Sequence, residues 1–265
     1  MELNKILDKI VMIVTATGDR IYRLSRAKKQ IAYKGVVNLV TQFDKISQRQ
    51  IVKFLKKEFP DYGILSEENI SYHTHDNIKW LVDPLDGTTN FAHNLPIWAI
   101  SIALEIEGEI VLGVVYDPTR KELFSSIKGK GAFLNGKRIS VSKTRKLDHS
   151  LLVTGFPYDI RESKENNLNY FARFCLKSQA VRRLGSAALD LCYTACGRFD
   201  GYWEIKLSPW DQAAGSLILK EAGGMITDFR GRPFSIYGKE VLGSNGYIHT
   251  QMLEVLNEKR RLCLF

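Results

Sequence analysis

The chain has 265 residues, an apolar content of 45% and a formal net charge of +9. This length allows one or two domains with a large buried core, and the composition is that of a globular protein rather than a disordered or fibrous one. The longest apolar runs are too short to span a bilayer and the first residues lack the layout of a signal peptide. We therefore expect neither a membrane protein nor a secreted one, and predict the cytoplasm as its location.

The first half of the chain is expected to form an antiparallel sheet with helices on one side. Apolar residues recur at helical spacing near the start, and a second helical stretch ends before Pro60. Apolar, β-rich runs meet at Glu107-Gly108, and Asn135-Gly136 marks a further hairpin turn. The expected elements are helices over residues 3–21 and 44–59 and strands over residues 63–66, 79–83, 97–106 and 109–116.

Strands and helices alternate in the second half, which predicts an α/β unit. The polar stretch at residues 142–146 indicates a boundary near residue 147. We therefore expect an N-terminal α+β part over residues 1–147 and a C-terminal α/β part over residues 148–265. The expected elements of the second part are strands over residues 151–154, 180–182 and 202–205 and helices over residues 164–177, 186–196 and 211–222.

Residues 80–91 read WLVDPLDGTTNF and are the most informative stretch of the chain. An apolar strand is expected to end on Asp83, and Asp86 follows three residues later. Two carboxylates at the end of a strand form a compact set of the hard oxygen ligands that Mg²⁺ prefers. The segment Gly87-Thr88-Thr89 leaves backbone N–H groups unobstructed where a helix could start, which suits a phosphate group. Asp-Pro and Asp-Gly are also common turn dipeptides, so an ordinary loop is the alternative.

Three more acidic residues stand where a strand ends or a helix begins. Glu67 follows a short strand, Asp44 lies at the start of the second helix, and Asp211 lies at the start of another. Each of them alone is explained as a helix cap or a solvated surface charge. Because such edges converge on one crevice in layered α/β folds, we expect the acids to meet there.

Residues 83–91 resemble the first signature of the inositol monophosphatase family, and residues 210–215 resemble the second. Glu67-Glu68, residues 38–41 and residues 185–189 also match the family pattern in order and spacing. The family consists of magnesium-dependent, lithium-sensitive phosphomonoesterases. The resemblance covers nearly the whole chain and implies an α/β fold of alternating α/β/α/β/α layers, a homodimer, and two to three Mg²⁺ ions in each active site.

The resemblance also implies a set of metal ligands. Glu67, Asp83 and the backbone carbonyl of Leu85 would hold a first ion. Asp83, Asp86 and Asp211 would hold a second, so that Asp83 bridges the two. A third, weaker ion would lie near Glu67. Most of the ligands then come from the N-terminal part, and Asp211 comes from the C-terminal part.

Further residues are assigned to catalysis and to the phosphate by the same resemblance. Thr88, paired with Asp44, would orient the nucleophilic water by hydrogen bonding. The backbone N–H groups of Gly87 and Thr88 would receive the phosphate group. The catalytic residues implied are Asp44, Glu67 and Thr88.

Substrate contacts are expected mainly from the C-terminal part. By resemblance, the Glu204 carboxylate would accept hydrogen bonds from a sugar or inositol hydroxyl; an exposed charge at a strand end is the alternative. Arg182 and Arg183 could grip a second phosphate or form a solvated strand-end pair, and Lys34 could cover the metal ions. The substrate-binding residues implied are Gly87, Thr88, Gly185, Ser186, Ala187, Glu204 and Arg183.

We therefore expect a Mg²⁺-dependent hydrolase that acts on a small phosphate ester, inositol 1-phosphate above all. A fructose 1,6-bisphosphatase, alone or with dual activity, is the next reading, followed by a histidinol or nucleotide phosphatase. From a different class, a basic RNA- or protein-binding factor on a phosphatase fold is the distant alternative. The basic residues are dispersed along the chain, which favours a solvated surface or the steering of anionic substrates over binding of nucleic acid.

Overall fold

The computed structural model describes residues 2–25, 31–33, 39–67, 70–72 and 77–258. Three residues named above, Lys34, Asn38 and Glu68, lie outside the described residues. The helices are α1 (Leu3–Leu24), α2 (Gln42–Glu58), α3 (Thr88–Ala92), α4 (Leu168–Lys177), α5 (Ala187–Ala195), α6 (Pro209–Glu221) and α7 (His249–Leu256), with a 3₁₀ turn at Leu147–His149.

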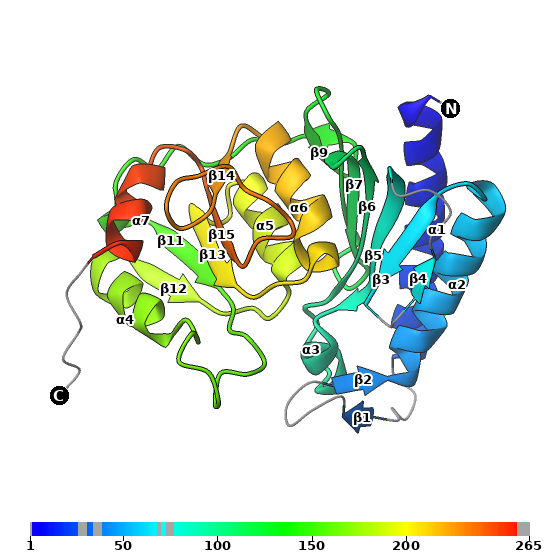
Figure 1. Ribbon diagram of the computed structural model, residues 1–265, viewed down its shortest axis with the longest axis horizontal. Coiled ribbons are helices and arrows are strands. Elements are labelled where there is room, and N and C mark those ends of the chain that lie inside the picture. Colours follow the sequence, from blue (N-terminus) through cyan, green and yellow to red (C-terminus); the bar gives the residue numbers. More distant parts are fainter. Residues whose placement is uncertain (1, 26–30, 34–38, 68–69, 73–76, 259–265) are drawn as a thin grey trace.

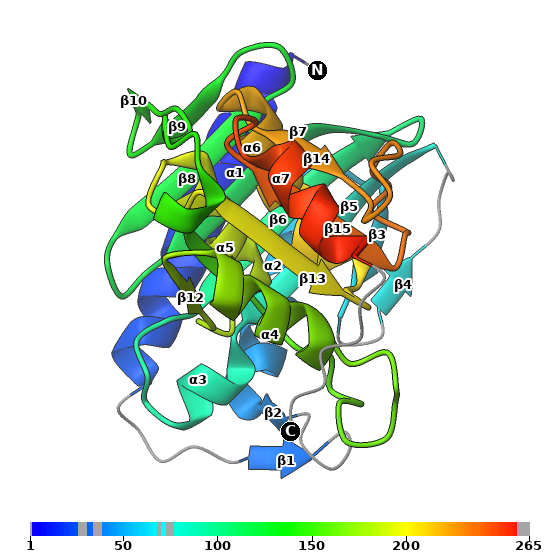
Figure 2. The same cartoon turned by 90° about the vertical axis from the view of Figure 1, so that its left-hand side faces the viewer.

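Helices and sheets alternate in five layers (Figure 1). Helices α1 and α2 cover the outer face of an eight-stranded sheet, and α5 and α6 lie between that sheet and a five-stranded one. Helices α4 and α7 cover the far face of the five-stranded sheet, where Figure 2 shows both of them in front of its strands. The predicted α/β/α/β/α layering is therefore confirmed.

The larger sheet has the order β10-β9-β8-β7-β6-β5-β3-β4 and is mostly antiparallel, as predicted. The exception is β3, which pairs with β5 in parallel. A separate pair is formed by β1 (Ile31–Tyr33) and β2 (Leu39–Thr41). The strands of the larger sheet are β3 (Gly63–Ser66), β4 (Ile70–Tyr72), β5 (Ile78–Asp86), β6 (Ala99–Ile106), β7 (Glu109–Asp117), β8 (Glu122–Ile127), β9 (Ala132–Leu134) and β10 (Lys137–Arg138).

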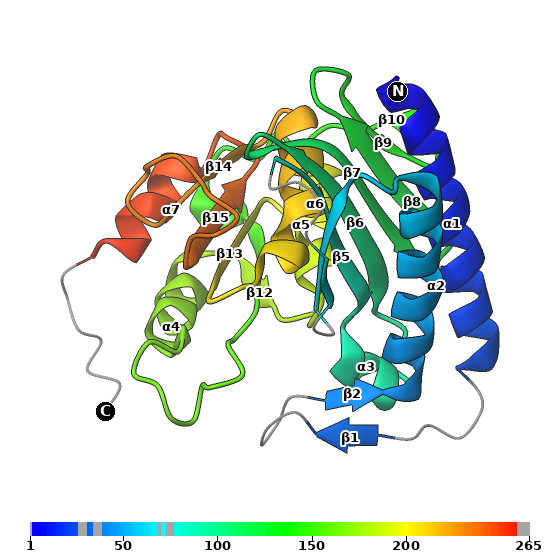
Figure 3. The same ribbon diagram turned by 45° about the vertical axis from the view of Figure 1, so that its right-hand side comes forward.

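The two outer helices are held on this sheet by apolar stripes. Ile6, Ile10 and Val14 recur at helical spacing on α1, and Ile51 and Leu55 do so on α2; all five are buried. They belong to one core cluster with apolar residues of β5, β6 and β7. Figure 3 shows α1 and α2 side by side along this face.

Strand β5 runs beyond its predicted end at Asp83 and continues to Asp86. Asp83 pairs with Ser101 of β6 and Asp86 with Ala99, so β5 contains one extra residue at this point. Pro84 has no N–H to donate to the ladder, which explains why the regular pairing is interrupted here. In a regular strand, residues three apart point to opposite faces, and an extra residue in a bulge reverses that relation. The bulge thus lets both carboxylates reach the same cavity.

The smaller sheet has the order β12-β11-β13-β15-β14 and is mixed. The predicted strands of the α/β unit are confirmed, and they pair in parallel around β11. The last two strands and α7 were not predicted, and β15 runs antiparallel to both of its neighbours. The strands are β11 (Leu151–Thr154), β12 (Ala180–Arg182), β13 (Gly201–Ile205), β14 (Met225–Thr227) and β15 (Glu240–Ser244).

Helix α4 begins at Leu168, four residues later than predicted. The preceding residue, Asn167, is buried and has a left-handed backbone with φ of 71°. Its side-chain amide donates hydrogen bonds to the Thr154 hydroxyl (2.9 Å) and the Gly155 carbonyl (2.6 Å), and its carbonyl oxygen accepts one from the Trp203 indole (2.7 Å). These long-range bonds fix Asn167 in a non-helical conformation, which local sequence patterns do not reveal.

The central helices join the two halves of the chain. Gly113 of β7 lies so close to α6 that a Cβ atom there would stand 2.9 Å from the Ala214 carbonyl oxygen. The surrounding core cluster combines Leu81 and Ala103 of the first half with Leu191 and Ala214 of the second. The two halves therefore share one core. The predicted division into an N-terminal part over residues 1–147 and a C-terminal part over residues 148–265 stays a prediction.

Candidate active site

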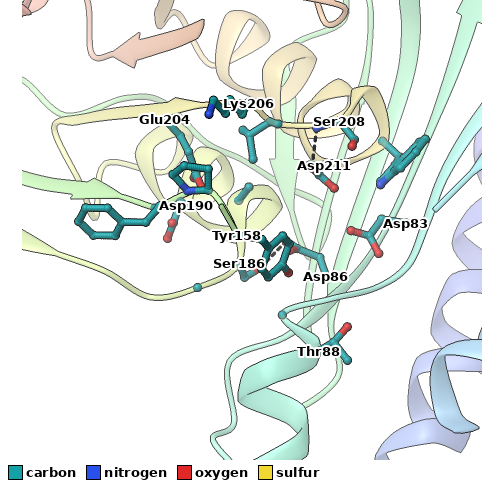
Figure 4. Close-up of a pocket in the computed structure, with 18 of the residues that line it drawn as sticks. Asp83, Asp86, Thr88, Tyr158, Ser186, Asp190, Glu204, Lys206, Ser208 and Asp211 are labelled. Atoms are coloured by element: carbon teal, nitrogen blue, oxygen red, sulfur yellow. Dashed lines mark hydrogen bonds between the residues drawn. The ribbon is translucent and has the colours of Figure 1, made fainter. Parts of the chain in front are cut away.

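A cavity of about 370 Å³ opens where β5, α3, α5 and α6 meet the segment between β11 and α4. Of the predicted site residues, all except Asp44 lie on its wall, and Asp44 bonds to one that does. The predicted lining residues are Glu67, Asp83, Leu85, Asp86, Gly87, Thr88, Arg183, Gly185, Ser186, Ala187, Glu204 and Asp211. Figure 4 shows Asp83, Asp86 and Asp211 at one end of the cavity and Glu204 at the other.

The three aspartates come from two elements, Asp83 and Asp86 from β5 and Asp211 from α6, and each has one oxygen fixed by a backbone N–H group. Asp83 accepts from Leu85 at 3.0 Å within the β5 bulge. Asp86 accepts from Ala188 at 2.8 Å, at the start of α5. Asp211 accepts from the N-cap residue of its own helix at 2.8 Å, in a capping box. Local structure therefore sets the direction of each carboxylate.

These carboxylates repel one another in a buried place. Burial raises the pKa of Asp83 well above its ordinary value, and Glu67, Asp86 and Asp211 raise it further. Burial also raises the pKa of Asp86 to about 6, although Ser186 and Ala188 stabilise its anion. The pKa of Asp211 is raised well above the ordinary value by burial and then by Asp86. A divalent cation would relieve this repulsion.

The donor set suits Mg²⁺. It consists of carboxylate oxygens and a strand-end carbonyl, which are hard ligands. Within the described part of the chain, no three Asp, Glu, His or Cys side chains converge as a complete ligand shell. Mg²⁺ usually keeps several waters and completes its coordination with substrate phosphate, so an incomplete protein shell fits this ion.

Thr88 and Asp44 form a buried pair beside the acids. The Thr88 hydroxyl donates to Asp44 Oδ1 at 2.8 Å and also lies 3.0 Å from the Leu85 carbonyl oxygen. Asp44 is held in turn by the Thr41 backbone N–H at 2.8 Å, in the capping box that starts α2. Because the proton of Thr88 is directed toward these acceptors, its oxygen can accept a hydrogen bond from a water in the cavity.

The opposite end of the cavity is built around Glu204, at the end of β13. Glu204 is 7% exposed, and its carboxylate accepts a hydrogen bond from the Tyr202 hydroxyl at 2.7 Å. Burial raises the pKa of Glu204 to about 7, while Tyr202 and Arg183 act in the opposite direction. Arg183 lies on the cavity wall near the Gly185 backbone. Arg182, in contrast, is exposed on β12 and is not part of the wall.

The backbone of Gly155 packs directly against the Glu204 carboxylate and limits where that carboxylate can lie. A Cβ atom on Gly155 would overlap the Glu204 carboxylate. Gly155→Ala should therefore displace that carboxylate while leaving the acids around Asp83 untouched. We expect kcat/KM for a polyol phosphate to fall about tenfold and that for p-nitrophenyl phosphate to stay within about twofold, since the latter has no hydroxyl to bind. Equal losses on both substrates would show that Gly155 supports the fold instead.

Some wall residues were assigned no role from the sequence, among them Trp210, which opens the second signature. Tyr158 is 58% exposed, yet the pKa of its phenol is raised by burial and by the acids around Asp83, beginning with Glu67. Its loop is anchored by Lys206, whose ammonium group donates to Asp159 at 2.7 Å and to Ser163 at 2.8 Å. These residues and Asp190 belong to no local motif, and only their position in the fold reveals them. The unassigned wall residues are Gly155, Phe156, Pro157, Tyr158, Asp190, Ile205, Lys206, Leu207, Ser208 and Trp210.

No described helix combines the length and the apolar character needed to cross a membrane. Residues 2–262 match the profile described as the inositol monophosphatase family. An inositol-1-monophosphatase of Synechocystis sp. is 43% identical over 96% of this chain and 90% of its own length. The Nus factor SuhB of Escherichia coli is 40% identical over 86% of each chain.

Solved structures show the same fold. The inositol monophosphatase of Anabaena (Nostoc) sp. superposes with a TM-score of 0.91 at 40% identity and covers 100% of both chains. An inositol monophosphatase/NADP phosphatase complexed with NADP and Ca²⁺ superposes with a TM-score of 0.85 at 27% identity, over 98% of this chain and 97% of the other. A divalent cation is therefore bound in a structure of this kind.

Proposed function

The chain belongs to the inositol monophosphatase family and is a phosphoric monoester hydrolase, and we propose that it hydrolyses inositol 1-phosphate with Mg²⁺ as its metal. One observation carries this proposal above the others. Buried, mutually repelling carboxylates occupy one end of a cavity, and a buried hydroxyl acceptor, Glu204, occupies the other. A phosphate ester of a polyol matches this arrangement, because its phosphate group would lie at the carboxylate end and its remote hydroxyl groups at the Glu204 end.

The proposed metal ligands are those implied by the family pattern. Glu67, Asp83 and the Leu85 carbonyl would hold one ion, and Asp86 and Asp211 would join Asp83 around another. Bound ions would supply positive charge that lowers the pKa of a water and neutralises phosphate oxygens. Two to three Mg²⁺ ions, a homodimer and a cytoplasmic location are proposed with the same function.

The remaining steps use groups of the chain itself. Thr88, with its proton directed to Asp44, would accept a hydrogen bond from the attacking water and so fix the direction of attack. The backbone N–H groups of Gly87 and Thr88 would hold the phosphate oxygens. Gly87 has a left-handed backbone with φ of 92°, and a Cβ atom there would stand 2.9 Å from the Ile97 carbonyl oxygen. Only glycine fits this turn at the cavity wall.

Glu204→Gln is expected to separate specificity from chemistry. The amide keeps the size of the carboxylate but weakens the hydrogen bond to a substrate hydroxyl, by about 1–3 kcal/mol. The value of kcat/KM for inositol 1-phosphate should fall about ten- to a hundredfold, and that for p-nitrophenyl phosphate should barely change. An equal loss on both substrates would assign Glu204 to the metals or the fold. No loss on either substrate would show that the charge of Glu204 contributes to neither binding nor catalysis.

The substrate itself is tested by phosphate release. Purified protein with Mg²⁺ would be offered inositol 1-phosphate, fructose 1,6-bisphosphate, histidinol phosphate, NADP and adenosine bisphosphate. We expect the highest kcat/KM on inositol 1-phosphate. Fructose 1,6-bisphosphate is the next candidate, because Arg183 on the cavity wall offers a cation for a second phosphate. A preference for any bisphosphate would replace inositol phosphate as the proposed substrate.

A second function is favoured by one finding, the 40% identity to proteins named Nus factor SuhB. The net charge of +9 also suits an acidic or nucleic-acid partner. We propose that the chain binds structured RNA in addition to its phosphatase activity. The test is binding of structured RNA by Asp83→Asn, a variant whose phosphatase site is disabled. RNA affinity that is absent at physiological salt would remove nucleic acid from the proposal.

A further inference from the structure

Asp190 is a buried carboxyl group for which the proposed chemistry has no role. It lies on α5 and is only 1% exposed. Neither of its carboxyl oxygens has a hydrogen-bond partner in the described part of the chain. Burying a carboxyl group without partners is unfavourable, and native proteins seldom retain such a group without a use for it.

The position of Asp190 connects it to the site. Ser186 caps α5, and its hydroxyl donates to Asp86 at 2.6 Å, so the start of this helix holds a candidate metal ligand. Asp190 follows Ser186 by four residues and therefore lies on the same side of the helix, about 6 Å further along its axis. It lines the same cavity. Figure 4 shows Asp190 next to Glu204, at the end away from Asp83.

The electrostatic surroundings agree with this placement. Burial raises the pKa of Asp190 well above its ordinary value, Glu204 and Asp86 raise it further, and Arg183 acts in the opposite direction. Two neighbouring carboxyl groups thus share one nearby guanidinium.

We propose that Asp190 and Glu204 together bind two neighbouring hydroxyl groups of the substrate, which makes Asp190 a second specificity-determining residue. Glu204 has one oxygen engaged by Tyr202, whereas both oxygens of Asp190 are buried without a hydrogen-bond partner among the described residues. A hydroxyl group donates one hydrogen bond and accepts others, so it can pair with a carboxyl group in either protonation state. The substrate class is then a polyol monophosphate with a vicinal diol remote from the ester. This inference rests on the proposed phosphatase function.

The test compares two variants on two substrates. Asp190→Ala removes the carboxyl group and should lower kcat/KM for inositol 1-phosphate at least about tenfold, mainly through KM. Activity on p-nitrophenyl phosphate should stay within about twofold, because this substrate has no hydroxyl. Asp190→Asn keeps a donor and an acceptor and should restore polyol activity to within about threefold of wild type. Thr194→Val is the matched control: Thr194 is buried one turn later, is not among the residues that line the cavity, and donates its hydroxyl to the Asp190 backbone carbonyl at 2.8 Å, so the substrate ratio should not change.

An analogue of inositol 1-phosphate that lacks one hydroxyl provides the second arm. On the analogue without the hydroxyl that Asp190 binds, the wild-type protein should show the loss, and Asp190→Ala should add nothing to it. Equal losses of Asp190→Ala on both original substrates, or no loss on either, would overturn the inference. Wild-type protein that cleaves p-nitrophenyl phosphate but no polyol phosphate would overturn the proposed substrate itself, and this inference with it.

Discussion

Asp83→Asn is expected to reduce turnover on the order of a thousandfold or more and to weaken Mg²⁺ binding, because it removes charge from the position proposed to bridge two ions. The substitution should have the opposite effect on the metal-free fold. Asp83 is buried, and Glu67, Asp86 and Asp211 raise its pKa. A neutral amide relieves this repulsion, so the thermal midpoint in EDTA should rise while the midpoint gain on adding Mg²⁺ should shrink.

Asp117→Asn is the matched control, since Asp117 is also a fully buried aspartate. It accepts hydrogen bonds from Thr119 (2.8 Å) and Arg120 (2.9 Å), away from the cavity. Its substitution should lower the thermal midpoint with or without metal and leave the Mg²⁺ dependence of turnover unchanged. Near-native turnover of Asp83→Asn, measured by phosphate release at saturating Mg²⁺, would show that the bridging assignment is wrong.

Removal of divalent metal should abolish activity and change how stability depends on pH. Activity in EDTA should fall below about 1% of its value with Mg²⁺, and Li⁺ should inhibit. In the metal-free protein the pKa of Asp86 is raised from 3.8 to about 6 and that of Glu204 from 4.5 to about 7. Groups with a raised pKa in the folded state stabilise the protein at low pH and lose that contribution as pH rises.

The thermal midpoint in EDTA should therefore fall by about 5 °C or more between about pH 4 and pH 7. Carboxylates with a lowered pKa, such as the half-buried Asp228, act in the opposite direction but below this window. Saturating Mg²⁺ should flatten the decline, because metal binding favours the ionised carboxylates. The measurement is a set of melting curves with and without metal. A midpoint in EDTA that rises across the window would contradict the buried acid cluster.

The sequence predicted those parts of the site that are encoded in short, local segments. Asp83 and Asp86 stand beside an apolar run that predicts a strand, and Asp211 stands at the start of a predicted helix. The chemical role of these acids and their position in the fold could therefore be inferred from the same short segments. Helix positions were predicted less well where distant residues decide them. Asn167 delays α4 because its amide bonds Thr154 and the Gly155 carbonyl, and no periodicity contains that information.

Asp190 shows why the rest could not be predicted. In the sequence it is one acid inside an apolar helix, and nothing local distinguishes it from an ordinary polar position. Its meaning depends on the direction in which α5 faces, which Ser186 and Ala188 set by bonding Asp86. Strands β14 and β15 were missed because residues after Gly224 offer only short apolar runs between polar turns. Burial and partners, which decide both cases, are properties of the assembled fold.

The hydrogen bonds that Ser186 and Ala188 make to Asp86 also determine when the metal site can form during synthesis on the ribosome. About a hundred residues separate the carboxylate from the groups that hold it, and Asp211 is synthesised later still. A nascent chain that has emerged only as far as residue 147 would expose Asp83 and Asp86 without their holders or their shared core. Such an incomplete chain should bind Mg²⁺ only weakly. We therefore expect Mg²⁺ to bind after synthesis of the chain is complete, and not to assist the folding of its first half.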